Sequence, residues 1–163
     1  MRFLYAIVLM MALAVAGSVS VHALESIPTR YVMVKLNVTD LNRSLNYYKN
    51  LIGLKESHRY GGSAPNFPLE VMLSETGKDL EAQIVLVDDK PKGSFELGNA
   101  FRSLVCVVPD VRAVVTHIAA AGFPVTVQPN DVKMPEIGYA SGLTVAFVKD
   151  PDGYLIELVQ WNK

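Results

Sequence analysis

The chain has 163 residues, a formal net charge of −1, 19% charged residues and 50% hydrophobic residues. This length is sufficient for one domain with a sizeable core. A charge so close to zero leaves no basic surface of the kind that nucleic-acid-binding proteins carry. We therefore expect a single domain without a nucleic-acid partner.

The N-terminal segment predicts a secretory signal. Met1 and Arg2 supply a positive end, residues 3–16 are an unbroken apolar run, and small residues lead to the cleavage pattern Val21-x-Ala23. The apolar run is shorter than the roughly 20 residues that span a membrane, so we favour a cleaved signal peptide over residues 1–23 to an uncleaved anchor. We expect a periplasmic or secreted mature chain, residues 24–163, with no stable membrane anchor after cleavage.

The single cysteine, Cys106, lies in the alternating stretch Leu104-Val105-Cys106-Val107-Val108. It cannot form an intramolecular disulfide, so an oxidising compartment is permitted but not required. Its position predicts a buried, unreactive thiol rather than a nucleophile.

The chain repeats one pattern twice. A strand-like run over residues 33–40 ends in Asp40, and a second run over 103–110 ends in Asp110 with the same spacing. Each aspartate is placed to cap a helix through its carboxylate. The two predicted helices stop at Gly53 and Gly122, and glycine is the usual residue just past a helix end.

Further short strands follow each helix, so each half reads as a β-α-β-β-β module. Proline and glycine in Asp150-Pro151-Asp152-Gly153 predict a tight turn between the last two strands. We expect modules over about residues 30–90 and 100–161, with strands at 55–60, 69–74, 82–87, 125–128, 143–149 and 154–160.

Two phrases of the sequence carry a family resemblance. Residues 38–48, Val-Thr-Asp-Leu-Asn-Arg-Ser-Leu-Asn-Tyr-Tyr, and residues 146–158, Ala-Phe-Val-Lys-Asp-Pro-Asp-Gly-Tyr-Leu-Ile-Glu-Leu, resemble the vicinal oxygen chelate superfamily, and most closely glyoxalase I. The resemblance covers about residues 31–161. It implies an α+β fold in which two modules form a cupped eight-stranded sheet, with helices outside and a small-molecule site in the cup. It also implies a homodimer.

In the metal-dependent members of that superfamily, four side chains point into the cup and hold a divalent ion. The matching positions here are Met33, Val85, Ser103 and Glu157. Valine is no ligand, methionine suits soft ions only, and neutral serine is weak, so one carboxylate remains where three or four ligands are needed. We therefore expect no metal and no cofactor. The arginine with which glyoxalase I holds a substrate carboxylate is also replaced, by Asn37.

Strand alternation places the remaining candidates in the cup. Glu157 is the candidate catalytic base, or else one half of a structural ion pair with Lys35 or Arg102. His58 and His117 are interpreted as ordinary surface histidines. We expect the small-molecule ligand to contact Lys35, Asn37, Ser103, Met33 and Val85.

Several functions stay open on the sequence alone. The first is a glyoxalase-like lyase or isomerase that works without metal, with Glu157 as base. The second is a non-catalytic binding or sequestration protein that resembles the bleomycin-resistance branch. Lactoylglutathione lyase activity and a degenerate member kept for assembly with a partner are further alternatives. The expected ligand is small, partly apolar and oxygen-bearing.

Overall fold

The computed structural model describes residues 32–62, 68–79, 81–89, 95–134 and 139–162, and residues 31–163 form one compact unit. The predicted signal peptide lies outside the described residues. The first module contains, in chain order, β1 (Met33–Asn37), α1 (Leu41–Asn46), the π-helical turn η1 (Tyr47–Ile52), β2 (Lys55–Tyr60), β3 (Leu69–Ser74) and β4 (Gln83–Asp88).

The second module repeats this order. It contains β5 (Leu104–Val107), α2 (Val111–Ala120), β6 (Val125–Met134), β7 (Tyr139–Lys149) and β8 (Leu155–Trp161). The fold class is therefore confirmed: two β-α-β-β-β modules in an α+β domain. The eight strands form two hydrogen-bonded sheets, ordered β1-β4-β3-β2 (sheet A) and β5-β8-β7-β6 (sheet B), rather than one continuous sheet.

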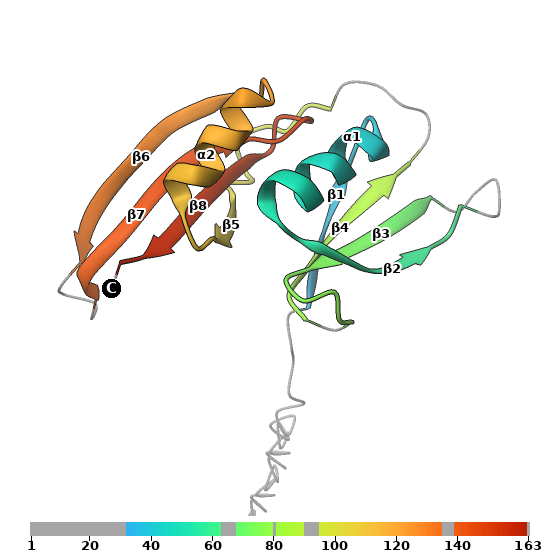
Figure 1. Cartoon of the computed structure of the whole chain (residues 1–163). Helices are drawn as coiled ribbons and strands as arrows, with labels where there is room; N and C mark the ends of the chain where they lie inside the picture. The colour runs from blue at the N-terminus through green and yellow to red at the C-terminus, as the bar shows by residue number, and fades with distance from the viewer. Residues whose placement is uncertain (1–31, 63–67, 80, 90–94, 135–138, 163) are drawn as a thin grey trace, which may run out of the picture. The chain divides into compact units, whose positions relative to one another are not determined.

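Each sheet pairs its first and last strands in parallel at one side, β1 with β4 and β5 with β8, and its other strands in antiparallel fashion. One helix covers one face of each sheet, α1 on sheet A and α2 on sheet B (Figure 1). This leaves the opposite face of each sheet uncovered by any described helix. We call these two surfaces open face A and open face B.

Both helix starts follow the sequence. The Asp40 carboxylate accepts a hydrogen bond from the Arg43 N–H at 3.0 Å, and the Asp110 carboxylate accepts one from the Ala113 N–H at 3.0 Å. Gly53 ends η1 with a φ of 95°, a left-handed conformation that glycine adopts without strain. The capping predictions are therefore confirmed at both helices.

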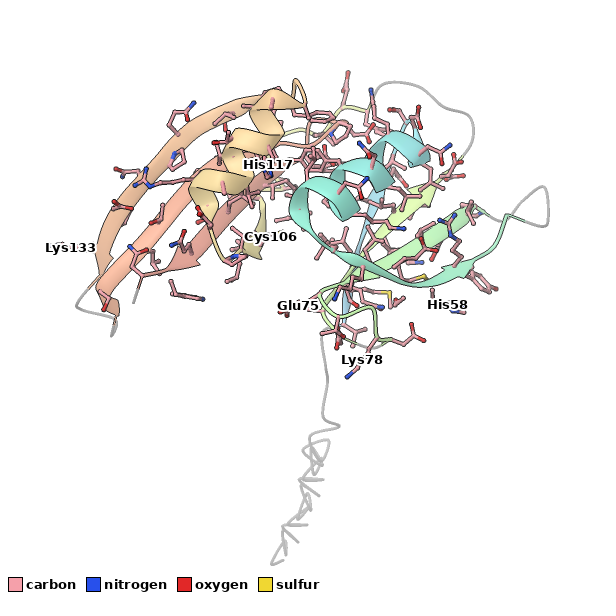
Figure 2. The ribbon with its side chains drawn as sticks, in the orientation of Figure 1. His58, Glu75, Lys78, Cys106, His117 and Lys133 are labelled. Atoms are coloured by element: carbon pink, nitrogen blue, oxygen red, sulfur yellow. The ribbon has the colours of Figure 1, made fainter. Side chains whose placement is uncertain are left out.

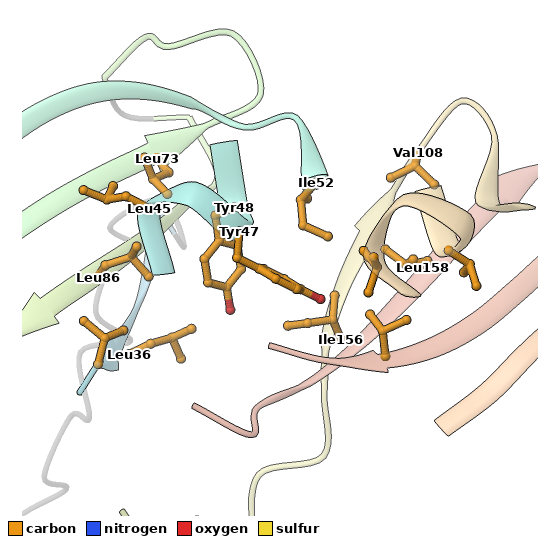
Figure 3. Packing of buried hydrophobic residues seen from close by; sticks show 14 of the residues in the cluster. Leu36, Leu45, Tyr47, Tyr48, Ile52, Leu73, Leu86, Val108, Ile156 and Leu158 are labelled. Carbon is orange, nitrogen blue, oxygen red and sulfur yellow. The ribbon is translucent and has the colours of Figure 1, made fainter. Parts of the chain in front are cut away.

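One core serves both modules (Figure 3). Leu36, Leu73 and Leu86 line the helix side of sheet A, and Ile156 and Leu158 line that of sheet B. The rings of Tyr47 and Phe123, from different modules, meet edge to face with centroids 5.0 Å apart. This shared packing explains why the two modules form one compact unit.

Among the described residues, none of the helices has both the length and the apolar composition needed to cross a membrane.

Candidate functional site

Strand register defines which residues share open face A, because directly paired residues point to the same side of a sheet. A row of paired residues crosses all four strands, from Lys35 through Val85 and Met72 to His58. The other residues of open face A in these registers are Met33, Asn37, Tyr60, Glu70, Gln83 and Val87. Met33, Lys35, Asn37 and Val85 therefore share one face of the sheet, as strand alternation predicted. Val85 is 0% exposed, however, so the expectation that it contacts a ligand is corrected.

The polar residues of open face A include a strong ion pair. The Lys35 ammonium lies 2.6 and 2.7 Å from the two carboxylate oxygens of Glu70, across the intervening strand β4. The Glu70 side chain is 14% exposed and that of Lys35 is 52% exposed. Lys35 thus pairs with Glu70, not with Glu157, and the alternative of a Lys35–Glu157 structural pair is corrected.

His58 also belongs to open face A, next to Met72 on β3. Its ring is exposed on the edge strand β2 (Figure 2). His58 is thus a surface histidine, as expected, and register adds that it lies on open face A. A register shift between Glu56 and His58, which strand alternation could not reveal, decides the face on which this residue lies. His117 is exposed on α2, as expected.

Open face B carries Glu157 and Ser103. Val105 pairs directly with Glu157, which pairs on its other side with Phe147. The Ser103 hydroxyl donates to a Glu157 carboxylate oxygen at 3.5 Å, the long limit of a hydrogen bond. Glu157 is half-buried, and no described Lys, Arg or His side chain lies within ion-pair distance of it.

The surroundings of Glu157 are apolar and open. Val105 is 61% exposed and Val107 59%, while Val127 and Trp161 are each close to half exposed, at 47% and 46%. Register places all four on open face B. Large apolar surface left open in this way typically marks a ligand or partner site. Open face B is therefore an apolar surface with one carboxylate, whereas open face A is the more polar of the two.

Cys106 points the other way, toward the core, and burial raises the pKa of its thiol to about 11. At neutral pH the thiolate is the reactive form, and this pKa keeps it scarce. The structure therefore agrees with an unreactive cysteine.

Two further acidic residues, which the sequence suggested only as turn formers, join the modules. The buried Asp150 carboxylate accepts a hydrogen bond from the Tyr48 hydroxyl at 2.8 Å, and burial raises its pKa. The Asp152 carboxylate accepts bonds from Thr39 and Ser44. The Asp-x-Asp-Gly spacing was visible in the sequence, but nothing there showed that its carboxylates reach the other module.

Comparison with known proteins decides the family. The sequence model of the Glyoxalase/Bleomycin resistance protein/Dioxygenase superfamily matches residues 30–158. The chain belongs to this superfamily. The resemblance inferred from the two sequence phrases is thereby confirmed.

Similar curated proteins are named as lyases. A probable lactoylglutathione lyase of Vibrio cholerae is 33% identical over 132 residues, which is 80% of this chain and 90% of the relative. A protein of the same name from Vibrio parahaemolyticus is 35% identical over 135 residues, with the same coverage. The chain is thus a glyoxalase-like member of the superfamily.

Solved structures agree on the fold. Glyoxalase I from Zea mays superposes with a TM-score of 0.70 at 24% identity, covering 82% of this chain and 45% of the maize chain. The trypanothione-dependent glyoxalase I of Leishmania major gives a TM-score of 0.64 at 23% identity, covering 81% and 86%. At this identity the likeness supports the fold alone.

The comparisons overturn the expectation that no cofactor is involved. The relatives are lactoylglutathione lyases and glyoxalase I enzymes, a class that typically depends on a divalent metal, so the family points to such an ion. The expectation of no cofactor was wrong because it rested only on the residues at the four positions that match the family's metal ligands.

The residues at those four positions do not complete a metal site on their own. Met33 and Val85 lie on open face A, and Ser103 and Glu157 lie on open face B. Only Glu157 is a common ligand of divalent ions. Within the described ranges, no three His, Cys, Asp or Glu side chains come together.

Proposed function

We propose that this chain is a glyoxalase-like lyase or isomerase that binds a small, partly apolar, oxygen-bearing molecule on its open faces, with Glu157 as the proton-accepting residue. The observation that carries the proposal is the position of Glu157. Its carboxylate is half-buried among apolar side chains, lies beside a hydroxyl donor, and has no described cation in contact. The curated relatives, named as lactoylglutathione lyases, support the same reaction class.

A carboxylate in this setting suits proton transfer. Glu157 accepts a proton from a carbon acid or a hydroxyl of the bound molecule and returns it to a neighbouring atom, so that the net change is an isomerisation without oxidant. Ser103 orients the carboxylate through its hydroxyl. The apolar surface around Glu157 holds the carbon part of the ligand and excludes water.

The polar groups of open face A complete the binding surface. The side chains of Lys35 and Asn37 are exposed there, and Lys35 is fixed by Glu70. Asn37 stands where glyoxalase I has an arginine for a substrate carboxylate, so we propose a substrate in which that carboxylate is absent or is bound elsewhere. This departure separates the proposed substrate from the glutathione adduct that the names of the relatives suggest.

Turnover of thiol adducts of 2-oxoaldehydes tests this proposal. The mature protein is assayed with hemithioacetals formed from glutathione and from smaller neutral thiols, with and without added nickel or zinc ions. The proposal expects turnover, with the neutral thiols favoured. Failure to turn over any of the adducts under any of these metal conditions would overturn it.

A second function, binding without turnover, is favoured by the open apolar surface. Val105, Val107 and Trp161 leave large apolar side chains exposed, which suits the binding of an apolar ligand. A thermal-shift screen separates this function from catalysis, because a ligand that binds the folded state raises its melting temperature by mass action. Stabilisation by a compound that is recovered unchanged would favour the binding function.

We also propose that the protein is a homodimer that uses its open faces. Val105 and Val107 leave apolar side chains exposed on the edge strand β5, and exposed apolar surface of this kind marks a partner site. The resemblance to glyoxalase I supports the same arrangement.

We propose a periplasmic or secreted location for the mature chain, on the basis of the sequence of residues 1–23. Mass spectrometry of protein exported by a bacterial host should find a chain that begins at Leu24. Recovery of membrane-bound protein that still begins at Met1 would contradict this location.

A further inference from the structure

The turn between β7 and β8 is attached to the other module by a buried carboxylate. The side chain of Asp152 is 0% exposed. One of its oxygens accepts hydrogen bonds from the Thr39 N–H at 2.9 Å and from the Thr39 hydroxyl, and the other accepts the Ser44 hydroxyl at 2.9 Å. The Arg43 guanidinium lies 3.4 Å away. A buried carboxylate with this many donors is held in one geometry.

The turn itself is braced from within. The Asp150 carboxylate accepts the N–H groups of Asp152 and Tyr154 at 2.9 and 2.8 Å. Gly153, with a φ of 91°, lets the chain reverse within this short space. The turn that carries Asp152 is therefore held in one conformation. Its hydrogen bonds to the first module fix the position of the start of β8 relative to that module.

Through the hydrogen bonds of Asp152, this turn links β1 and β8, the two strands that carry the candidate site. Thr39 follows β1, which bears Lys35 and Asn37, and Asp152 precedes β8, which bears Glu157. A second link runs beside it, because the Tyr154 hydroxyl donates to the Asn37 carbonyl at 3.2 Å. Since the described strands of sheets A and B do not pair with each other, no ladder of hydrogen bonds fixes β1 relative to β8.

We propose that Asp152 is a positioning residue, which sets the placement of open face A relative to open face B and thereby of Asn37 relative to Glu157. The assignment of these two residues to a site rests on the proposed function; the mechanical role of Asp152 does not. Thr39 and Ser44 of the first module donate the hydrogen bonds that hold the Asp152 carboxylate. Removing the carboxylate leaves the core, the Tyr154–Asn37 bond and the Tyr48–Asp150 bond in place. It takes away the acceptor that Thr39 and Ser44 share, so the end of β8 is held less tightly against the end of β1.

A distance measurement between the sheets tests this role directly. Spin labels are attached at Lys55→Cys on β2 and Gln128→Cys on β6, both exposed edge-strand positions. Cys106 stays unlabelled because it is packed against the core. We expect one narrow distance distribution in the otherwise unchanged protein and a broadened or shifted one with Asp152→Ala. Asp152→Asn keeps an oxygen for the Thr39 N–H and should restore part of the narrow distribution.

The control is an aspartate that takes no part in the hydrogen bonds between Asp152 and the first module. Asp131 pairs with Arg112 at 3.0 Å on the outer side of the second module, where both side chains are mostly exposed. Asp131→Ala should leave the distance distribution unchanged. If Asp152→Ala does not fold, the double variant Thr39→Val with Ser44→Ala removes the same hydroxyl donors from the other side and gives the decisive measurement.

The outcomes separate this proposal from the proposed function. Unchanged distributions in folded Asp152→Ala, or in the double variant, would overturn the positioning role. Absence of turnover by the unmodified protein overturns the catalytic proposal alone, because the distance measurement needs no substrate. Where turnover of a hemithioacetal is observed, Asp152→Ala should lower kcat at least tenfold. A variant that is only less stable would have an unchanged kcat at temperatures below its melting temperature.

Discussion

Asp150 is a carboxyl group that the fold keeps out of water. It is 3% exposed, and it accepts hydrogen bonds from the Tyr48 hydroxyl and two backbone N–H groups. Burial is the largest effect on its pKa and raises it above the ordinary value, and the nearby Asp152 adds to the rise, while the hydrogen bonds oppose it. The folded protein therefore binds a proton at Asp150 more tightly than the unfolded chain does.

This pKa shift predicts an unusual dependence of stability on pH. Stability from a group with a raised folded pKa is present below its unfolded pKa and is lost as the pH rises through the folded pKa. We expect the stability advantage of the unmodified protein over Asp150→Asn to be greatest near about pH 4 and to shrink toward about pH 7. Urea titrations of both proteins across this range measure it. An advantage that grows with pH would contradict the assigned direction.

Glu157 shows how far single residues can be predicted. Alternation along β8 and the family phrase placed it on the open side of the sheet, and the structure agrees. Its partner could not be predicted, because the pairing of Lys35 with Glu70 depends on the strand order β1-β4-β3, which brings them across one strand. Long-range pairs of this kind follow from topology, not from local pattern.

At the scale of elements, η1 buries two adjacent tyrosines. In an α-helix neighbouring residues point about 100° apart. The π-helical turn over Tyr47–Ile52 buries both side chains completely. The strands and the helix starts followed from apolar alternation and capping aspartates, but the sequence contains no simple signal for a π-helical turn.

The two tyrosines provide a matched pair of variants. Tyr48 donates its hydroxyl to Asp150, whereas the Tyr47 hydroxyl is buried with no hydrogen-bond partner among the described residues. We expect Tyr48→Phe to lower the free energy of unfolding by about 1.5–3 kcal/mol, the usual cost of losing a hydrogen bond to a charged group. Tyr47→Phe should leave it unchanged or raise it, because it removes a buried hydroxyl that has no partner among the described residues and loses no bond. Equal losses in chemical denaturation would contradict the hydrogen-bond assignment.

At the scale of the whole molecule, the open faces are the sheet surfaces that no described helix covers. Val105 and Val107, on the edge strand β5 of open face B, are more than half exposed. The family resemblance implied one cup, and strand alternation placed Met33, Lys35, Asn37, Val85, Ser103 and Glu157 in it. The structure divides these residues between two sheets. Whether a ligand, a second copy or both cover them is decided by contacts beyond one chain, which sequence patterns do not encode.

The proposed homodimer gives a prediction at this scale. Val105→Glu places a second carboxylate beside Glu157 on open face B, and like charges directly opposite each other in a sheet destabilise any interface that buries them. We expect a monomer for Val105→Glu and a dimer for the unmodified protein in analytical ultracentrifugation. The control Thr116→Glu changes an exposed residue of α2, which covers the opposite face of sheet B. A monomer in both the unmodified and the changed protein would contradict the dimer.

Glu157 is proposed to transfer a proton on a glyoxalase-like fold, and the kcat of Glu157→Gln tests this role most directly. Glutamine keeps the size and the hydrogen-bonding reach of glutamate but does not accept a proton at neutral pH. We expect the melting temperature and ligand binding to be retained while turnover of the best hemithioacetal falls by about 10²–10⁴-fold, the usual contribution of general acid–base catalysis. Undiminished turnover by a folded Glu157→Gln protein would contradict the claim.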